Sequence, residues 1–550
     1  MAGDDSPSPS AVYKGSGDLP DKNPSFVGDP YSEDNGDSGD HGADTELKRS
    51  LSTRHLTMIA LGSSIGMGLW LGSGTSLANG GPAGIFLGYC LAGSMIWCVS
   101  HSIGEMACVY PLPSAFVQWT GKFVDPAAAF ALGWSYWFSY CITIANELAS
   151  ANTVITYWTT RVPIAGWISI WLVIIILINI GAVTLFGEIE VVASTIKFGW
   201  IFVVIISMIV MSAGGAGYDA VGFRYWNEIP FTNGFKGFLA VMPTCIFAMS
   251  GSENSGLVAA ETANPKKSIP RAVGSIWLRL ALFYLVGSLM VTINVDPRNS
   301  RLFGVDSNGT GSSPFVIAYS DAGIPVLAHM MNAVILISVV STGSISGYGG
   351  SRTAMGLAYL DMAPKVFTKA DRTGRPWWGL VPTFVLGGGL AYLNVSESGA
   401  DVFKWFSNLT SLFTLFGWGM ICLSHIRFRH AWARQGRTAE ELPWKSWIYP
   451  VGPWWGLTMC ILLIIVQFYL AVWPLTDPQG AQTFFANYIS VIVIVVLWLG
   501  ARAYYRGRWW VNLDHIVLDE GRRFYKNDVE KAKPTGVKGY AKRAVSAVFS

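Results

Sequence analysis

The chain has 550 residues, of which 51% are hydrophobic and only 13% are charged, and its formal net charge at pH 7 is +3. A string of soluble domains would carry far more charged surface, so the composition excludes that architecture. The balanced charge offers no basic patch for nucleic acid. We find no cluster of metal ligands, no nucleophile motif and no phosphate-binding loop, and we therefore expect neither an enzyme nor a bound cofactor.

Apolar stretches long enough to cross a bilayer recur along the chain, and we count about twelve of roughly 18 residues or more. Numbered as spans 1 to 12, they lie near residues 57–77, 83–107, 126–157, 164–186, 191–213, 237–260, 272–295, 323–357, 376–395, 402–425, 452–474 and 484–503. The sequence therefore predicts an all-α polytopic membrane protein with one transmembrane helix for each of these 12 spans, embedded in the lipid bilayer.

Lysine and arginine are distributed unevenly between the loops. The loops after spans 2, 4, 6, 8 and 10 carry about 13 of them, against about 6 in the opposite set, so the positive-inside rule places both termini in the cytoplasm. Residues 1–46 are rich in Ser, Gly, Pro and Asp and are expected to form a disordered tail. Residues 47–503 then form the helical domain and residues 504–550 a polar cytoplasmic tail. Asn308, a candidate glycosylation acceptor, would lie outside.

Span 1 contains an interruption, because its middle reads Gly62-Ser63-Ser64-Ile65-Gly66-Met67-Gly68. Glycine and serine are poor helix formers, and an unwound backbone in a membrane is tolerated only where protein or a water-filled cavity satisfies it. Freed N–H groups and a helix N-terminus would then face a small anionic group near the midplane. The candidate substrate-binding residues here are Ser64, Gly66, Met67 and Gly68. The alternative is that the glycines only allow close helix packing.

Span 6 contains a second interruption, at Ala248-Met249-Ser250-Gly251-Ser252. Freed carbonyls at Phe247, Ala248 and Met249 could accept hydrogen bonds from an ammonium group, and the Phe247 ring could gate the pocket. Interruptions at matching places in two halves, with spans 3 and 8 both unusually long, favour a transporter built on a five-plus-five inverted repeat. The two breaks together suit a zwitterionic substrate. Helix packing again is the alternative.

Ionisable side chains inside the membrane are costly and therefore indicate function. Lys197 in span 5, Glu147 in span 3 and Glu253 just after the span 6 break are the candidates for proton coupling. For Lys197 the alternative is a side chain that reaches the cytoplasmic surface, and for the two glutamates it is structural hydrogen bonding. Glu105, near the cytoplasmic end of span 2, is expected to have a structural role.

Several ordered motifs resemble those of the fungal amino acid permeases, the yeast amino acid transporter family of the amino acid–polyamine–organocation superfamily. The most specific is Glu261-Thr262-Ala263-Asn264-Pro265, which continues to Ala272 after span 6. The other motifs lie at residues 54–62, 65–69, 104–107, 133–137, 351–353, 363–365, 371–376, 422–429 and 441–445. The resemblance extends over about residues 47–525.

The resemblance implies the LeuT-type fold and proton-coupled uptake of amino acids across the plasma membrane. It implies that the substrate carboxylate binds at the span 1 break and the ammonium at the span 6 break, and Lys197 matches the family's lysine in span 5. Relatives carry ubiquitylated lysines in their tails, for which Lys14 and Lys22 are the candidates here. Ubiquitin-ligase machinery is therefore an expected partner, besides the substrate and protons.

The chain departs from the family pattern inside the expected pocket. Relatives usually have Thr or Ser where this chain has Met67, and often Ser then Phe where it has Ala248 and Met249. Losing a hydroxyl that contacts a carboxylate costs about 1 kcal/mol or more. These changes leave open a related amine as substrate, such as carnitine, another betaine or a polyamine.

We interpret the chain as a secondary transporter that imports amino acids with a proton. Alternating access would come from spans 1, 2, 6 and 7 rocking against spans 3–5 and 8–10. A transporter-like nutrient sensor is the alternative from another class. A sensor is expected to carry a long structured cytoplasmic extension, and tails of about 46 residues favour transport.

Overall fold

The structure is a computed structural model of the chain. It describes residues 52–62, 65–215, 220–254, 256, 261, 265–302, 312–371, 374–396, 399–475, 479–506 and 509–523. Ser64 of the predicted site, the N-terminal tail 1–46 with Lys14 and Lys22, and Asn308 lie outside the described residues.

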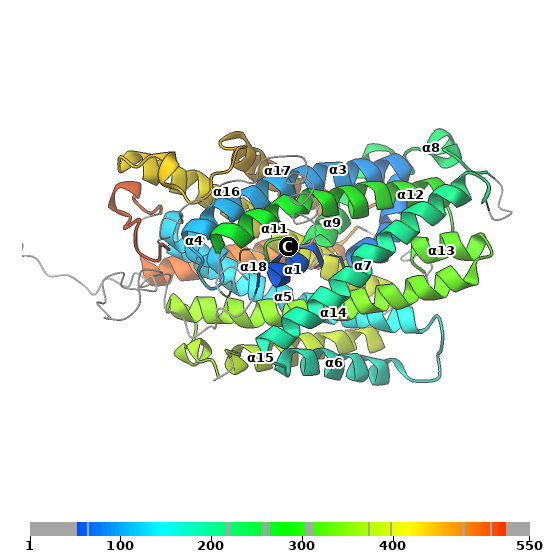
Figure 1. Cartoon of the computed structure of the whole chain (residues 1–550), viewed down its shortest axis with the longest axis horizontal. Helices are drawn as coiled ribbons and strands as arrows, with labels where there is room; N and C mark the ends of the chain where they lie inside the picture. Colours follow the sequence, from blue (N-terminus) through cyan, green and yellow to red (C-terminus); the bar gives the residue numbers. More distant parts are fainter. Residues whose placement is uncertain are drawn as a thin grey trace, which may run out of the picture.

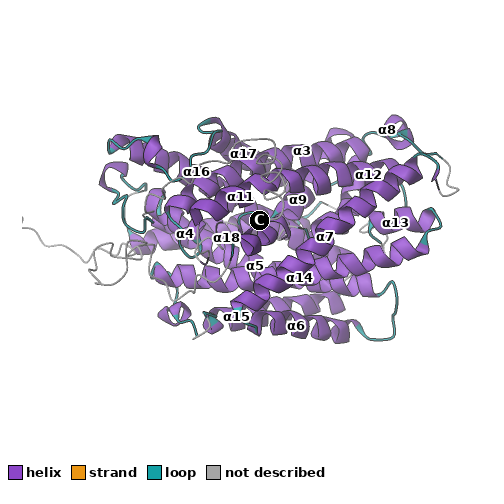
Figure 2. Cartoon of the chain, viewed as in Figure 1, coloured by secondary structure: helices purple, strands orange, loops and turns teal. Residues whose placement is uncertain are grey.

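The described part of the chain is helical, and its strand pairing is limited to one isolated bridge between Leu302 and Ser312 (Figure 2). Among the described residues, eight helices are long and apolar enough to cross a membrane. They are α3 (Gly72–Val109), α7 (Val183–Ser212), the run Pro265–Asn294 formed by α11, η3 and α12, α14 (Pro325–Tyr359), the run Trp377–Val395 formed by α15 and η5, α16 (Gly399–Arg434), α17 (Val451–Val472) and α18 (Ala481–Tyr505). The predicted class, an all-α multi-pass membrane protein, is confirmed.

The four remaining predicted spans coincide with an interrupted helix, a long helix and two shorter helices. They are α1 (Thr53–Gly62) with α2 (Met67–Trp70), α5 (Pro126–Ile155), α6 (Ile164–Ile180) and α9 (Gly234–Met249). The count of 12 spans and the five-plus-five repeat remain predictions. The two long helices of the predicted repeat, α5 and α14, pack against each other.

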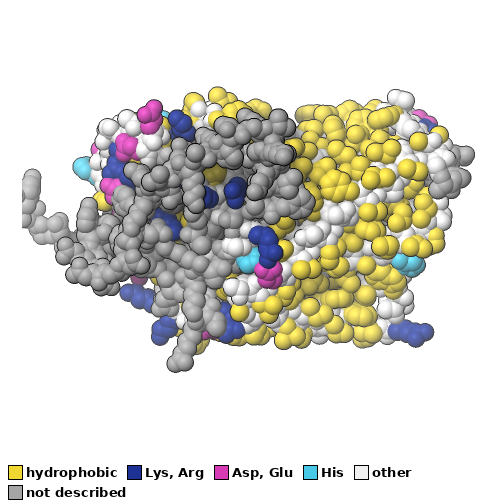
Figure 3. Space-filling view, in the orientation of Figure 1, with side chains coloured by type: hydrophobic (Ala, Val, Ile, Leu, Met, Phe, Trp, Pro, Cys, Tyr) yellow, Lys and Arg dark blue, Asp and Glu magenta, His cyan; other side chains and the backbone are white. Residues whose placement is uncertain are grey.

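The long helices run between two ends of the molecule. Helix α4 (Ala115–Phe123) lies at the left end in Figure 1, whereas α8 (Arg224–Glu228) and α13 (Pro314–Asp321) lie at the right end. On the face seen in Figure 3, hydrophobic side chains cover most of the described surface between the ends. The exposed residues of α7, α17 and α18 include Ile206, Ile465 and Val496, each more than 60% exposed. Such a surface is stable only against lipid.

Both predicted helix interruptions are present. Helix α1 ends at Gly62, Gly66 is extended with φ −130° and ψ −154°, and α2 begins at Met67. Helix α9 ends at Met249, and Gly251 turns the chain with φ 88°, a conformation that favours glycine.

The two interruptions touch each other. A Cβ atom added to Gly68 would lie 2.6 Å from the Cα of Ala248 and 2.9 Å from Cδ1 of Phe247. Only glycine lets the start of α2 approach the end of α9 this closely. The glycine therefore does permit close packing, as the sequence-based alternative stated, but the helices are interrupted as well.

The beginning of the predicted C-terminal tail packs against the helical body. Helix α18 continues to Tyr505, two residues beyond the predicted domain boundary. Residues 511–523, which we call the C-terminal segment, are tied at both ends, because Val511 N–H donates to the Val124 carbonyl at 3.0 Å and Arg523 N–H donates to the Val109 carbonyl at 2.9 Å. Leu513 and Leu518 of this segment are buried.

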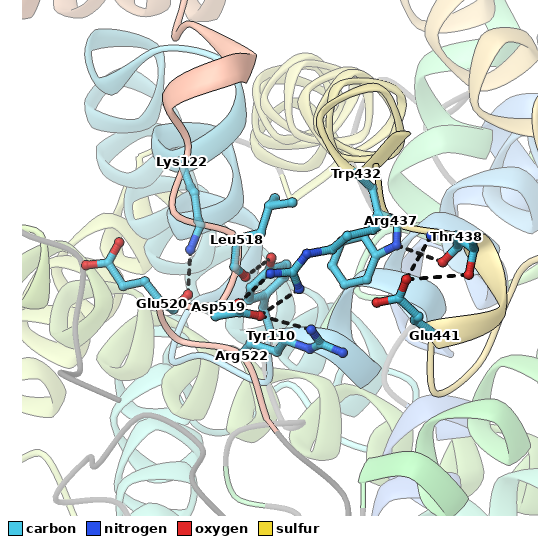
Figure 4. Close-up of polar contacts among 10 residues, drawn as sticks. All are labelled: Tyr110, Lys122, Trp432, Arg437, Thr438, Glu441, Leu518, Asp519, Glu520 and Arg522. Carbon is cyan, nitrogen blue, oxygen red and sulfur yellow. Dashed lines mark hydrogen bonds and ion pairs between the residues drawn. The ribbon is translucent and has the colours of Figure 1, made fainter. Parts of the chain in front are cut away.

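Charged groups hold the middle of the C-terminal segment (Figure 4). The Asp519 carboxylate accepts hydrogen bonds from Arg437, three residues after the end of α16, and from Arg522 at 2.9 Å. The hydrogen bonds from Arg437 are the main reason that the pKa of Asp519 falls to about 2. Lys122 of α4 donates to the Glu520 carbonyl, and burial lowers the pKa of this lysine to about 8. The segment therefore links α4 to α16 at one end of the molecule.

Replacing Asp519 with Asn should loosen the C-terminal segment. The carboxamide keeps the size but loses the charge that binds Arg437, a loss of about 1 kcal/mol for an ion pair that is partly exposed. Trypsin cleavage at Arg522 and Arg523 of the purified protein should then be roughly fivefold faster. In the unaltered protein the low pKa of Asp519 makes the contribution of this carboxylate to the docking insensitive to pH above about 4 and weaker as pH falls from there toward 2. The matched control is Asp514→Asn, whose more exposed carboxylate lies 3.6 Å from Arg434; equal cleavage of the two variants would contradict this role.

Replacing Gly68 with Ala should destabilise the protein, because the new methyl group meets the backbone of Ala248. Overpacking of this kind costs about 1–3 kcal/mol. The melting temperature of the purified protein in detergent measures the effect. The control is Gly199→Ala on α7, where an added Cβ has no atom within 4 Å. An unchanged melting temperature for Gly68→Ala would show that the two interruptions can separate without cost.

Candidate functional site

Two of the predicted coupling residues bind opposite ends of the first interruption. Lys197, on α7, donates from Nζ to the carbonyl of Gly62 at 3.1 Å. Glu147, on α5, accepts at Oε1 from the backbone N–H of Met67 at 3.4 Å. Both side chains are buried, with exposed fractions of 0% and 1%.

This arrangement matches the electrostatics of helix ends. Gly62 is the last residue of α1, whose final carbonyls carry partial negative charge, and Met67 is the first residue of α2, whose N–H groups carry partial positive charge. The ammonium of Lys197 therefore lies at the negative end and the carboxylate of Glu147 at the positive end. A change in the protonation of either residue changes what holds the interruption in place. Lys197 is buried at the break and does not extend to the surface, which was the alternative for this residue.

Gly66 lies in a narrow space within the interruption. A Cβ atom there would lie 2.7 Å from Glu147 Oε1 and 2.8 Å from the hydroxyl oxygen of Thr342. The Thr342 hydroxyl donates to the Ile65 carbonyl at 3.3 Å. The Met67 side chain is 1% exposed, and its sulfur accepts a hydrogen bond from the hydroxyl of Ser150 on α5. The residue that departs from the family pattern thus fills the contact between α2 and α5.

The carbonyls at the second interruption already have protein donors. The Phe247 carbonyl accepts from Ser250, that of Met249 from the Ser252 hydroxyl at 2.9 Å, and that of Ala248 from the Tyr284 hydroxyl at 2.6 Å. A carbonyl has two lone pairs. Those of Phe247 are both used, because the Ser250 N–H also donates to this carbonyl, at 3.1 Å. The Ala248 and Met249 carbonyls can each still accept a second bond from a substrate ammonium. The ring of Phe247 packs edge to face on Phe403 of α16, with centroids 5.7 Å apart.

Glu253, the third predicted coupling residue, supports the second interruption. Its carboxylate accepts from the Gly251 N–H at 3.1 Å, from the Trp418 indole at 3.1 Å and from the Tyr136 hydroxyl at 3.3 Å. Three donors stabilise a buried carboxylate and fix the turn that follows α9. This geometry favours the structural alternative for Glu253.

Three buried residues escaped the sequence analysis. Ser341, on α14, accepts from Lys197 Nζ at 2.9 Å and donates to Glu190 Oε2 at 2.6 Å. Glu190 was missed because predicted span 5 began at residue 191, although α7 begins at Val183. Arg279 donates to the Ala60 carbonyl at 2.6 Å and to the Ser252 hydroxyl, so it connects α1 with the second interruption. As a charge inside predicted span 7, Arg279 was detectable by the rule applied to Lys197.

Two further motifs of the sequence analysis meet in a buried ion pair. Arg352 Nε lies 2.9 Å from Glu261 Oε1, with side chains 4% and 1% exposed, and the Tyr348 hydroxyl donates to the same carboxylate. Glu105 lies within ion-pair distance of His425 and Arg429, as expected for a structural residue. Across the described ranges no group of three His, Cys, Asp or Glu residues could hold a metal ion.

Comparisons with known proteins agree with these motifs. The sequence model of the family described as "Amino acid permease" matches residues 55–513. The chain is 39% identical over 505 residues to the general amino-acid permease GAP2 of Candida albicans, covering 90% of this chain and 85% of that protein. It is 38% identical over 517 residues to the cationic amino acid transporter 1 of Schizosaccharomyces pombe, with 92% and 87% coverage, and 39% identical over 493 residues to the S-adenosylmethionine permease GAP4 of Candida albicans, with 88% and 80% coverage.

Among solved structures, a manganese transporter of Eremococcus coleocola aligns with 82% of this chain and 93% of its own at 15% identity, with a TM-score of 0.49, which is too low to define the fold. The family resemblance found in the sequence is confirmed by the family match and by the curated relatives. The chain belongs to the amino acid permease family and is a multi-pass membrane transporter of amino acids rather than an enzyme.

Proposed function

We propose that this protein is a proton-coupled secondary transporter that imports amino acids across the plasma membrane by alternating access, with twelve spans and both termini in the cytoplasm. The observation that carries the proposal is the pair of protonatable residues at the first interruption: Lys197 on the last carbonyl of α1 and Glu147 on the first N–H of α2. A transporter couples to protons when the groups that bind the proton also shape the substrate site.

The substrate class follows from the two interruptions and from the relatives. Three relatives are named as a general amino-acid permease, a cationic amino acid transporter and an S-adenosylmethionine permease. All of these compounds share an α-carboxylate beside an α-ammonium. In our proposal the carboxylate approaches the N–H groups at the start of α2, around Gly66 and Gly68, and the ammonium approaches the carbonyls at the end of α9. Met67, Ala248 and Met249 then influence which amino acids fit.

Glu147 supplies a physical reason for coupling. Its carboxylate accepts a hydrogen bond from the Met67 N–H, which lies beside the N–H groups that would bind the substrate carboxylate. Two carboxylates in one buried site repel each other, so substrate binding favours protonation of Glu147, and protonation favours substrate binding. Proton and substrate would therefore bind together from outside.

Release to the cytoplasm requires the opposite end to open. In the proposed topology the Glu261–Arg352 pair lies near the cytoplasmic face, between the segment after the second interruption and the scaffold helix α14. The attraction within a buried ion pair is strong only while water is excluded, and a partner left alone in the interior is an uncompensated charge. Its separation would accompany opening toward the cytoplasm, while spans 1, 2, 6 and 7 rock against the scaffold.

The function is tested by uptake in yeast cells that lack their own amino acid permeases. Cells that express this chain should accumulate radiolabelled amino acids faster at external pH 5 than at pH 7, and a protonophore should abolish the accumulation. Carnitine and polyamines belong in the same panel. Uptake of amino acids that ignores both pH and the protonophore would refute proton coupling, and uptake of only carnitine or polyamines would refute the proposed substrate class.

Lys197→Met should uncouple transport. The thioether side chain nearly keeps the size but cannot bind a proton or donate to the Gly62 carbonyl, so pH-driven accumulation should fall by about tenfold or more. The control is Lys236→Met, because Lys236 donates to the Pro474 carbonyl at 3.0 Å and not to a residue of the interruption. Size-exclusion chromatography of both variants checks folding. Normal pH-driven uptake by Lys197→Met would exclude this lysine from coupling.

A further inference from the structure

A hydrogen-bonded chain connects Lys197 to a second buried carboxylate on the same helix. Lys197 Nζ donates to Ser341 Oγ at 2.9 Å, and the Ser341 hydroxyl donates to Glu190 Oε2 at 2.6 Å. The exposed fractions of Lys197 and Glu190 are 0% and that of Ser341 is 4%. A hydroxyl that accepts from one titratable group and donates to another can pass a proton between them.

The hydrogen-bonded path from Lys197 to Glu190 runs along α7 toward one side of the membrane. Glu190 and Lys197 are seven residues apart on α7, which places them on one helix face and about 10 Å apart along its axis. Glu190 lies nearer the start of α7, where Glu188 pairs with Arg54 and His55 at the start of α1. In the proposed topology this is the cytoplasmic end. The hydrogen bonds therefore lead from the first interruption toward the cytoplasm.

The charged groups around Lys197, Ser341 and Glu190 allow Glu190 to bind one proton. Lys197 interacts with Glu190 on its own helix and with Glu147 of α5. On the cytoplasmic side, Glu188 of α7 is paired with Arg54 and His55 of α1. Within the part of the chain that the structure describes, Oε1 of Glu190 has no hydrogen-bond partner. A buried carboxylate oxygen without a donor is costly, and protonation of the carboxyl group lowers that cost because a neutral acid is easier to bury than a charge.

We propose that Glu190 is the group through which the transported proton leaves Lys197 for the cytoplasm, with Ser341 as the relay; this inference rests on the proposed proton-coupled function. One N–H bond of the Lys197 ammonium breaks as its proton bonds to Ser341 Oγ, and the hydroxyl proton of Ser341 passes to Glu190 Oε2. The charged pair becomes a neutral amine and a neutral carboxylic acid, so no net charge is created in the membrane. The acid then loses its proton to the cytoplasm, and Lys197 takes up the next one from the side of Glu147.

The arrangement differs from a structural ion pair. A pair that only stabilises the fold gains most from direct contact between ammonium and carboxylate. Here the hydroxyl of Ser341 separates the two groups, and the ammonium also binds the Gly62 carbonyl at the interruption. Movement of α1 during transport would therefore change the strength with which Lys197 holds its proton.

The test uses the full-length protein in liposomes and a radiolabelled mixture of the standard α-amino acids. Uptake driven by an alkaline interior requires proton release, whereas exchange of internal for external amino acids, without a gradient, does not. Glu190→Gln should lower gradient-driven uptake by about tenfold or more and leave exchange within about twofold, because the carboxamide accepts no proton. Ser341→Ala should give the same pattern, and Ser341→Thr, which keeps the hydroxyl, should restore driven uptake. The control is Glu188→Gln, an exposed carboxylate on the same helix, which should not separate the two activities.

Each result decides the matter. Driven uptake that survives in Glu190→Gln, or in Ser341→Ala, overturns the relay. Loss of both driven uptake and exchange in a variant that remains monodisperse in size-exclusion chromatography shows a structural role and also overturns it. The unaltered chain is measured first: if its uptake ignores the gradient, proton coupling itself fails, and this failure is distinct from that of Glu190.

Discussion

The break between α1, which ends at Gly62, and α2, which begins at Met67, is the constraint on which the rest of this structure depends. A helix that ends inside a membrane exposes carbonyls on one side of the gap and N–H groups on the other, and lipid can satisfy neither. The protein meets this demand with an ammonium from α7 and a carboxylate from α5. Both groups are protonatable, so the side chains that hold the break in place are the same ones that our proposal uses for proton coupling.

The second interruption extends the same principle. Helix α9 ends where Gly68 of α2 contacts its backbone, so the conformation of each broken helix depends on its contact with the other. Tyr284, in the wide helical turn η3 (Leu280–Val286), donates to the Ala248 carbonyl, and Arg279 just before that turn connects α1 with Ser252. A departure from regular α-helix in span 7 thus directs side chains at the interruption in span 6. The polar groups named here are tolerated inside the membrane because each has a partner supplied by another helix.

Local chemistry made much of this protein predictable. The length and hydropathy of the apolar stretches indicated a helical membrane protein, because only helices satisfy their own backbone in lipid. Clusters of glycine and serine located both interruptions, at Gly66 and Gly251, because these residues are weak helix formers wherever they occur. The cost of burying charge singled out Lys197 and Glu147. Motifs such as the one beginning at Glu261 indicated the family, because each consists of residues that are contiguous in the chain.

Pairings between distant segments could not be read from the chain. A span boundary placed at residue 191 hid Glu190, since helix ends are poorly defined by hydropathy, and only the position of Ser341 on α14 connects it to Lys197. The C-terminal segment looked like a polar tail, but Asp519 pairs with Arg437, which follows the end of α16. The sequence by itself determined the class of protein, the family and the places where helices break, because these depend on residues close together in the chain. Which charge faces which helix end was decided by the tertiary structure alone, because that depends on how the helices pack.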